Sequence, residues 1–369
     1  MQEYRLLIDS LEYSRELERA IGAATQSIYM QFFTFEADVV GERYARLLME
    51  KAGDGLDVRL ILDGYYQLIV SDRPVRFPTC RPAEFRAVRK EFARTKKMIA
   101  EMRDGGVQIL EINNRFHGLA LLRRNHKKIV VVDCETAYLG GFNLSEHNFA
   151  WHDFAVRISG SVVKGIAEDF DSTWYGRPAS YPMSSNGDFL LGNVGDNKVL
   201  RDYIFQAIDN ARSAVFIECP YIGGAVFEKL LAAASRGVSV SVIYPKRNNI
   251  HRHSLWMTKH LEQYLVNLAA KNKIRVSLYN KNGGMTHAKV MLVDGEMACF
   301  GSCNFDAFGF RFYDDLNLVS RNQSLIQELG ARVMEEDLKY SEPFLAGKVA
   351  SPRQVLGRIV NSAYRRLLE

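Results

Sequence analysis

One spacing pattern occurs twice in this chain and constrains its fold more than any other feature. The pattern is H-x-K-x4-D-x6-G-[GS]-x-N, and both copies keep every interval. The first copy runs from His126 to Asn143, and the second runs from His287 to Asn304. A chance match to so many fixed positions is rare, so two matches indicate a duplicated unit. The sequence therefore predicts two similar halves that carry one copy of the motif each.

The first two fixed residues of the motif suit phosphoryl chemistry. His126 and Lys128 are two positions apart, so on a strand they point to the same face, and the apolar run 129–132 marks that strand as buried. Histidine titrates near neutral pH and can act as a nucleophile or a proton donor. Lysine supplies positive charge for phosphoryl oxygens. We expect the same chemistry from His287 and Lys289 in the second copy.

The remaining motif residues are expected to shape the site and to complete it. Asp133 and Asp294 follow the lysines at an odd offset, which turns them to the other side as turn or scaffold residues. Tight turns follow, with four structural residues: Gly140, Gly141, Gly301 and Ser302. Asn143 and Asn304 come after these turns. We expect both amides to return to the cleft and to hydrogen-bond a phosphoryl oxygen.

The segments around the two motifs repeat in the same order. Before each motif, strands alternate with helical stretches; the strands are expected near residues 27–31, 57–63 and 107–112, and near 214–218, 237–244 and 274–279. Such alternation favours an α/β fold. We predict tandem duplicated lobes at residues 1–180 and 190–345, joined by a loop-like segment and each built on a mixed sheet flanked by helices. The active site is expected at the interface between the lobes.

Composition narrows the class of protein. The chain has 369 residues, 47% of them hydrophobic and 25% charged, which is typical of a soluble protein large enough for two lobes. We see no basic and apolar leader, and no apolar run approaches the roughly 18 residues of a membrane span. The 5 cysteines lack the spacing of a paired-ligand site. We therefore expect reduced thiols in a cytoplasmic protein, with no metal and no cofactor.

Residues 72–97 form a basic insertion in the first half. They carry nine basic and three acidic side chains, a net charge of +6, which exceeds the +5 of the whole chain. Such a segment suits an anionic membrane surface, at about 1 kcal/mol per basic residue. It also suits a nucleic-acid backbone. The alternative is a helix face that is only solvated.

A basic amphipathic helix is predicted at the end of the chain, over residues 351–369. An apolar stripe at helical spacing runs through the segment, and arginines lie off the stripe. Such a helix can lie in a bilayer interface. Docking of the same helix on its own lobe remains the alternative.

The two motifs, the duplication and the segment order resemble the phospholipase D superfamily, and within it the bacterial cardiolipin synthases. The particular markers of this resemblance are Phe32-Phe33-Thr34-Phe35, Asp38-Val39-Val40-Gly41, Trp151-His152-Asp153 and Asn304-Phe305-Asp306. The chain has Phe308-Gly309 where that family usually has Arg-Ser. It looks like the shorter members without membrane spans. The resemblance implies an enzyme peripherally associated with the inner face of the cell membrane.

The resemblance also implies a mechanism. One histidine attacks the phosphorus of a phosphatidyl group while the other protonates the leaving alkoxide, and an acceptor alcohol then takes the group from the phosphohistidine. His126 is expected as the nucleophile and His287 as the acid and base, although the near-symmetry of the halves leaves the reverse open. In that family an acidic residue downstream of each motif pairs with the motif histidine. The matching positions are Asp153 and Asp315, with Asp314 as the alternative to Asp315.

The resemblance implies an anionic phospholipid such as phosphatidylglycerol as the substrate. A lipid glycerol as acceptor would make the enzyme a synthase, and water would make it a phospholipase. A metal-independent nuclease is a further alternative, although nucleic acid is the less expected partner, and a non-catalytic membrane scaffold is the third. The sequence leaves the oligomeric state open.

Side chains outside the motif positions are expected to be ordinary. Lys127, Arg123 and Arg124 are interpreted as charges on the rim of the site. The other histidines are interpreted as surface or loop residues; they are His117, His147, His152, His251, His253 and His260.

Overall fold

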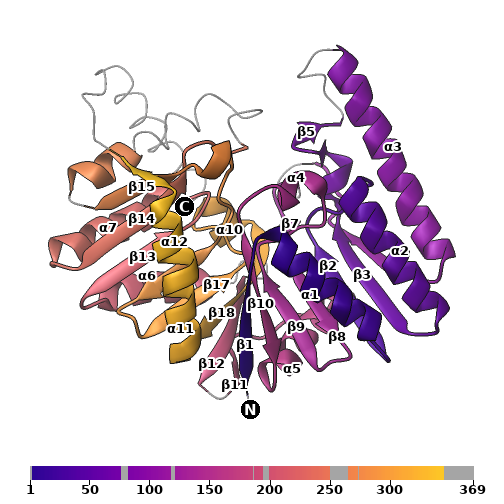
Figure 1. Cartoon of the computed structure of the whole chain (residues 1–369), viewed down its shortest axis with the longest axis horizontal. Coiled ribbons are helices and arrows are strands. Elements are labelled where there is room, and N and C mark those ends of the chain that lie inside the picture. The colour runs from indigo at the N-terminus through magenta and orange to yellow at the C-terminus, as the bar shows by residue number, and fades with distance from the viewer. Residues whose placement is uncertain are drawn as a thin grey trace.

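Two lobes of helices and strands stand side by side in the computed structural model of the chain (Figure 1). The structure describes residues 2–75, 82–117, 121–185, 187–193, 199–249, 265–272 and 274–344. The predicted helix at residues 351–369 lies outside the described residues, as do His251, His253, His260 and positions 76–81 of the basic insertion.

The first lobe is built on a seven-stranded sheet with the order β1-β10-β9-β8-β2-β3-β6. Its strands are β1 (Glu3–Ile8), β2 (Ser27–Phe32), β3 (Asp57–Asp63), β6 (Gln108–Ile112), β8 (Ile129–Val132), β9 (Thr136–Gly140) and β10 (Phe154–Ser159). Strands β2, β3 and β6 are parallel, and the others pair antiparallel. Helices α1 (Asp9–Ala23), α2 (Val39–Gly53) and α3 (Pro82–Asp104) pack on its outer face through a common apolar core.

The second lobe repeats this sheet. The order is β11-β12-β18-β17-β16-β13-β14-β15-β19, in which the run from β12 to β15 matches the whole first sheet strand for strand. Its strands are β11 (Met183–Ser185), β12 (Asp188–Asn193), β13 (Ala214–Glu218), β14 (Ser239–Pro245), β15 (Arg275–Tyr279), β16 (Val290–Val293), β17 (Met297–Gly301), β18 (Tyr313–Ser320) and β19 (Ser341–Pro343). Helices α6 (Val199–Asn210) and α7 (Gly224–Ser235) cover its outer face.

The inner faces of the two sheets meet in one core. Ile129 and Val131 of β8 belong to the same apolar cluster as Val290 of β16 and Phe300 of β17. Helices α5 (Val162–Trp174) and α11 (Gln323–Leu329) also contribute to this cluster. The four β8 residues are all buried, because both faces of that strand are covered. The predicted duplicated α/β fold is thus confirmed, whereas the predicted lobe limits stay a prediction.

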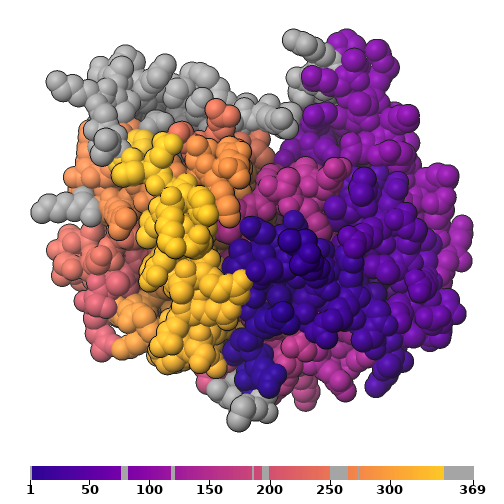
Figure 2. All heavy atoms as spheres, in the orientation of Figure 1, coloured from indigo at the N-terminus to yellow at the C-terminus, as the bar shows by residue number. Residues whose placement is uncertain are grey.

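The outer surface also ties the lobes together. Arg332 donates to the carbonyl oxygen of Leu6 at 3.2 Å and pairs with Glu12 at 2.8 Å, so an arginine near the end of the second lobe binds the start of the first. In Figure 2, α11 and α12 (Glu336–Lys339) lie directly against the first residues of the chain. The lobes therefore share an apolar core and a polar rim.

Two short backbone pairings cross between the lobes and carry the motif residues. Strand β7 (Arg124–Asn125) lies parallel to β18, and the backbone N–H of His126 donates to the carbonyl of Asp314 at 2.8 Å. In the symmetric position, His152 pairs with Thr286, and the N–H of His287 donates to the carbonyl of His152 at 2.7 Å. Each motif therefore begins on backbone that is hydrogen-bonded to the opposite lobe.

The basic insertion folds mainly into α3. Helix α3 begins at Pro82, and its apolar face includes Val88, which is buried. Its exposed face is basic, with Arg86, Arg89, Lys90, Arg94, Lys96 and Lys97. No described helix combines the length and the apolar composition that crossing a bilayer requires.

Two of the three rim charges predicted beside the first motif, Arg124 and Lys127, are buried instead, whereas Arg123 is exposed. Lys127 is 1% exposed and forms an ion pair with Asp169 at 2.8 Å. Arg124 is 2% exposed and donates to the carbonyl oxygens of Leu121 and Asn113. For these two residues the prediction was wrong because the whole segment from Arg124 to Val132 is buried, and backbone carbonyls and a buried carboxylate satisfy the two cations.

Candidate active site

Both motif histidines line one cavity between the lobes. This cavity has a volume of about 240 Å³, and His126, His287, Asn143 and Asn304 all line it. His126 precedes β8 and His287 precedes β16, so the same local geometry occurs once in each lobe. The cross-lobe backbone pairings turn both segments toward the shared cavity.

Each histidine is held by a buried carboxylate from the opposite lobe. The Nδ1 of His126 lies 2.9 Å from Oδ1 of Asp315, and the Nδ1 of His287 lies 2.7 Å from Oδ2 of Asp153. The expected pairing of each histidine with the acid of its own half is therefore wrong. The reason is the cross-lobe pairing, which places the first residues of β18 beside His126. Asp315 provides the carboxylate, and Asp314 provides a backbone oxygen.

This geometry fixes the tautomer of both rings. An ionised carboxylate accepts a hydrogen bond and so keeps the ring proton on Nδ1, with the lone pair on Nε2, whereas a protonated carboxyl donates to Nδ1 and leaves the ring proton on Nε2. Burial lowers the pKa of His126 to about 4, and the charge of Lys128 acts in the same direction. Burial and the charges of Lys289 and Lys128 hold the pKa of His287 well below its ordinary value. In the free enzyme both rings thus favour the neutral form.

The two carboxylates differ because their lobes differ at one motif position. The hydroxyl of Ser302 donates to Asp315 at 2.7 Å, whereas the first lobe has Gly141 at this position. Burial opposes ionisation of Asp315, but His126, Lys128 and Ser302 lower the pKa of this carboxyl below its ordinary value. Burial raises the pKa of Asp153 to about 7, so below that pH its protonated carboxyl donates to Nδ1 of His287 and the ring proton lies on Nε2. The environments of His126 and His287 are therefore not equivalent.

Gly141 is required by the close approach of Asp153. A Cβ atom at this position would lie 2.3 Å from Oδ2 of Asp153, which is the oxygen that holds His287. The glycine therefore leaves the room in which the carboxylate of the first lobe reaches the second motif.

The motif lysines are buried beside the histidines. Lys128 donates to the carbonyl oxygen of His126 at 2.6 Å, and Lys289 donates to that of His287 at 2.5 Å. Burial lowers the pKa of both ammonium groups. Among the described residues neither group has a second hydrogen-bond partner, so each keeps donors for an anion in the cavity.

The two asparagines are oriented through their side-chain oxygens. Oδ1 of Asn143 accepts from the backbone N–H of Thr34 at 3.3 Å, and Oδ1 of Asn304 lies 3.9 Å from the sulfur of Cys219. Within the described part of the chain, neither Nδ2 group has a hydrogen-bond partner. Both amides can therefore donate to an anion.

Asp133 and Asp294 lie outside the cavity and bind backbone. Asp133 accepts from the N–H groups of residues 25, 26 and 27 at 2.8 to 2.9 Å. Asp294 accepts in the same way from residues 212, 213 and 214. These bonds lower the pKa of Asp133 and bring that of Asp294 to about 2, although burial acts in the opposite direction. Each aspartate thus joins the end of one central strand to the start of its neighbour.

Aromatic side chains surround the histidines, and two of them belong to segments that carry the family resemblance. The ring of Phe33 lies 4.9 Å from that of His126, and Trp151 lies 4.9 Å from His287. Tyr65, Tyr313 and Phe308 also line the cavity. Phe308 belongs to the departure noted in the sequence, so an aromatic ring stands where the resembled family usually has Arg-Ser.

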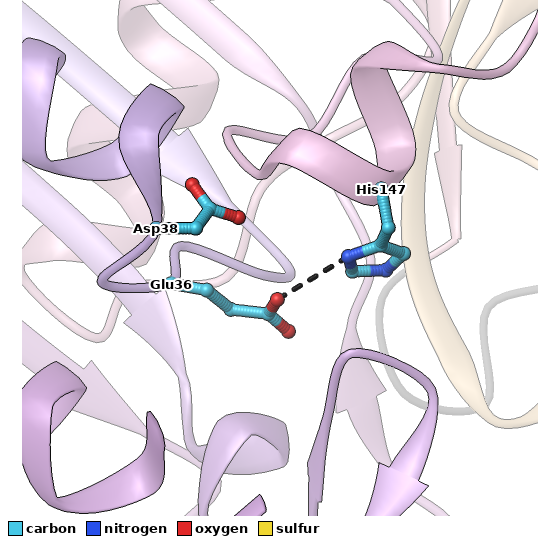
Figure 3. Close-up of side chains that lie close together, drawn as sticks. All are labelled: Glu36, Asp38 and His147. Atoms are coloured by element: carbon cyan, nitrogen blue, oxygen red, sulfur yellow. Dashed lines mark ion pairs between the residues drawn. The ribbon is translucent and has the colours of Figure 1, made fainter. Parts of the chain in front are cut away.

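His147 was interpreted as an ordinary surface residue, but it lines the same cavity. Figure 3 shows its ring directed at Glu36, with Nδ1 at 3.3 Å from Oε2 of that carboxylate. Its Nε2 lies 3.8 Å from Oδ1 of Asp72. Burial opposes the charged form of this ring, yet the Glu36 carboxylate raises the pKa of His147 above its ordinary value.

His152 is also not a surface residue. It is 7% exposed, and its two ring nitrogens lie 2.6 Å from Asp9 and 2.9 Å from Asp337. Burial disfavours the charged ring, but the two carboxylates raise the pKa of His152 well above its ordinary value. Asp337 belongs to the second lobe, so the imidazolium joins the lobes directly behind Asp153.

Two groups of described side chains have the spacing of metal ligands. In each of them the ligand atoms lie within 4.8 Å of one another; the groups are Glu36, Asp38 and His147, and His152, Glu218 and Asp337. In the first, Asp38 accepts from the N–H groups of Val40, Gly41 and Glu146 and lies at the start of α2 (Figure 3). In the second, carboxylates already bind both nitrogens of His152. The expected absence of a metal and of a cofactor stays a prediction.

The arrangement defines a class of site. Two neutral imidazoles present Nε2 to one cavity, each is oriented by a buried carboxylate, and two ammonium and two amide groups surround them. One ring can attack a phosphorus atom while the other delivers a proton to the leaving oxygen. The cations and amides can stabilise the charge that develops on the phosphoryl oxygens.

Comparisons with known proteins give the family. Residues 17–174 and 204–336 match the family model described as "Cardiolipin synthase, PLD-like domain", so the chain belongs to this family. The predicted membership of the phospholipase D superfamily and the prediction of an enzyme are thereby confirmed.

Individual relatives cover most of the chain. It is 29% identical to cardiolipin synthase A of Pseudomonas entomophila and 24% identical to the probable cardiolipin synthase YwiE of Bacillus subtilis. The matches cover 89% and 92% of this chain, and 67% and 66% of those proteins. The chain thus spans about two thirds of their length.

Solved structures share the fold. The phosphatidylserine synthase of Haemophilus influenzae superimposes with a TM-score of 0.72 at 14% identity, over 99% of this chain and 93% of that one. The polyphosphate kinase of Porphyromonas gingivalis gives a TM-score of 0.62 at 13% identity, over 99% of this chain and 53% of the other.

The crossed carboxylate at His126 gives a test of its importance. We expect Asp315→Asn to lower turnover by roughly 10³- to 10⁴-fold, because an amide no longer holds the Nδ1–H tautomer. Asp314→Asn is the matched control. Its turnover should stay within about tenfold of the wild type, because Asp314 holds His126 through its backbone carbonyl, which the substitution keeps. Steady-state kinetics on phospholipid vesicles measure both, with thermal unfolding as a check of the fold. Equal losses in the two variants would contradict the assignment.

Proposed function

We propose that this chain is a phosphatidyltransferase of the cardiolipin synthase type, which exchanges phosphodiesters on phosphatidylglycerol-like lipids through a phosphohistidine. The observation that carries the proposal is the shared cavity, in which both carboxylate-oriented histidines face one space. The names of the relatives support a phospholipid as the substrate.

In the first step, Nε2 of His126 attacks the phosphorus of the donor lipid. An N–P bond forms, the bond from phosphorus to the glycerol oxygen breaks, and His287 gives its Nε2 proton to that oxygen. Asp315, ionised beside Ser302, stabilises the positive charge that His126 acquires. Lys128, Lys289 and the two asparagine amides bind the phosphoryl oxygens.

In the second step an acceptor alcohol takes the phosphatidyl group. His287, whose Nε2 now carries a lone pair, removes the proton of the acceptor hydroxyl, the new O–P bond forms, and the N–P bond to His126 breaks. An alcohol on a lipid gives a transferase product, and water gives phosphatidic acid.

The roles of the two histidines can be distinguished with a donor lipid whose leaving group needs no proton. We expect His287→Ala to form the phosphohistidine from a phosphatidyl 4-nitrophenyl ester, because nitrophenolate leaves without a proton, and we expect His126→Ala to form none. On phosphatidylglycerol vesicles both variants should lose activity by at least roughly 10²-fold. Acid-quench trapping and lipid mass spectrometry provide the measurements. If a phosphohistidine is trapped only in His126→Ala, the roles of nucleophile and acid are reversed. A wild type that turns over no lipid would refute the proposed function.

The pKa values predict a bell-shaped pH dependence of kcat/KM. The rate should fall as the pH drops through about 4, where His126 takes up a proton and stops being a nucleophile. It should also fall as the pH rises through about 7, where the Asp153–His287 pair loses the proton that the leaving group needs. Rates from pH 3.5 to 9 on short-chain lipids would show the two limbs, and Asp153→Asn should remove the upper limb. An unchanged profile in that variant would contradict the assignment of the acid.

We also propose that the enzyme associates peripherally with an anionic membrane through the exposed basic face of α3. Removing three cations with Arg86→Gln, Arg89→Gln and Lys90→Gln should weaken binding to phosphatidylglycerol vesicles roughly 100-fold, at about 1 kcal/mol each. Cosedimentation measures this binding. The matched control removes three exposed arginines elsewhere, Arg15, Arg46 and Arg275, and should bind like the wild type. Equal weakening of both triple variants would argue against a specific role of α3.

A further inference from the structure

A second and larger cavity adjoins the catalytic one. It has a volume of about 940 Å³, against about 240 Å³ for the cavity of the two histidines. Four side chains line both cavities; they are Asp72, His147, Trp151 and Asn249. These residues therefore form a shared wall, which we call the divider.

The divider is polar and joins the lobes. Nδ2 of Asn249, from the second lobe, donates to Oδ1 of Asp72 in the first lobe at 3.1 Å, and the hydroxyl of Tyr221 hydrogen-bonds the side-chain oxygen of Asn249. The Nε2 of His147 lies 3.8 Å from the same oxygen of Asp72. A hydroxylated molecule that crosses from one cavity to the other would therefore meet hydrogen-bonding groups.

The larger cavity is lined by two arginines, one from each lobe. Arg73 is on β5 (Arg73–Pro74), and Arg247 follows β14. In the part of the chain that the structure describes, neither guanidinium has an ion-pair or hydrogen-bond partner. Lys246 also lines the cavity, but it pairs with Glu342 at 2.7 Å. Arginine is always charged and its planar fork matches a phosphate, so the pair favours an anion with phosphate oxygens.

The rest of the lining suits the apolar part of an amphiphile. Val266, Leu278, Met285 and Phe344 line the cavity together with the two arginines. Ligand cavities commonly measure about 300–1,000 Å³, so the catalytic cavity is too small to hold a phosphatidyl group and a second lipid headgroup together. Once the phosphatidyl group is on a histidine, an acceptor lipid needs separate space, and the larger cavity provides it.

We propose that this cavity is the acceptor site, and that it binds an alcohol that itself carries a phosphodiester, namely the headgroup of a second anionic phospholipid. The inference rests on the proposed transferase function. Arg73 and Arg247 hold the phosphodiester of the acceptor, and the hydroxyl end of the headgroup passes the divider toward His287. There the acceptor oxygen bonds to phosphorus, its proton goes to Nε2 of His287, and the N–P bond to His126 breaks.

This site would decide which alcohol takes the phosphatidyl group. Water and small alcohols need no phosphate anchor and can reach the catalytic cavity without the arginines. Loss of the arginines should therefore change the distribution of products and leave the formation of the phosphohistidine intact. Part of the basic insertion thus gains a specific role, because Asp72 and Arg73 are its first two residues.

A competition between two acceptors in one reaction tests the inference. Phosphatidylglycerol vesicles are incubated with the enzyme and ethanol, and mass spectrometry measures the ratio of cardiolipin to phosphatidylethanol. The double variant Arg73→Gln/Arg247→Gln should lower this ratio roughly 10- to 100-fold, since each lost arginine removes charge-assisted hydrogen bonds to the acceptor, while phosphatidylethanol stays within about twofold. The matched control, Arg15→Gln/Arg46→Gln, should keep the wild-type ratio.

The outcomes separate this inference from the proposed function. If the wild type forms both products and the double variant keeps the ratio, the acceptor site is wrong and the transferase stands. If the double variant loses both products equally while its thermal unfolding midpoint is unchanged, the arginines bind the donor lipid and not the acceptor. That result would also overturn the inference. A wild type that forms phosphatidylethanol but no cardiolipin would exclude a lipid acceptor. Formation of neither product would refute the transferase itself.

Discussion

The active site depends on the hydrogen bonds that cross between the lobes. Backbone pairing of β7 with β18, and of His152 with Thr286, brings each motif against the opposite lobe. The same pairing places Asp315 beside His126 and Asp153 beside His287. Buried carboxylates are costly unless they have partners, so each His–Asp pair also stabilises the contact on which it depends. Assembly of the lobes and assembly of the site are therefore one event.

Much of the fold could be predicted because spacing and periodicity are local properties. The doubled motif indicated the duplication, and the alternation of strands and helices indicated the sheets. The partner of each histidine could not be predicted in this way, because Asp153 and Asp315 follow their motifs at positions that fit either pairing. Likewise, charge alone suggested that Lys127 is exposed, and only the fold shows Asp169 beneath it.

The halves have diverged where chemistry benefits from a difference. Two identical imidazoles would compete for the roles of nucleophile and acid, but Ser302 supports the negative charge of Asp315 and Gly141 gives Asp153 no such bond. The pKa of Asp153 is raised and that of Asp315 is lowered. The carboxyl beside His287 therefore keeps a proton that the carboxyl beside His126 has lost. The hydroxyl of Ser302 thus makes the two halves of the site different. In the motif this is the variable position, with Gly141 in the first copy and Ser302 in the second.

The exchange of carboxylates has a consequence for the origin of the chain. Because neither half contains both a histidine and the acid that orients it, an isolated half would be incomplete. Two copies of one ancestral half, related by a twofold axis through the phosphorus position, would complete each other by the same contacts. Fusion of the two copies would then allow each to mutate separately, and the exchange of a glycine for a serine is a step that a symmetric dimer could not take on one side alone.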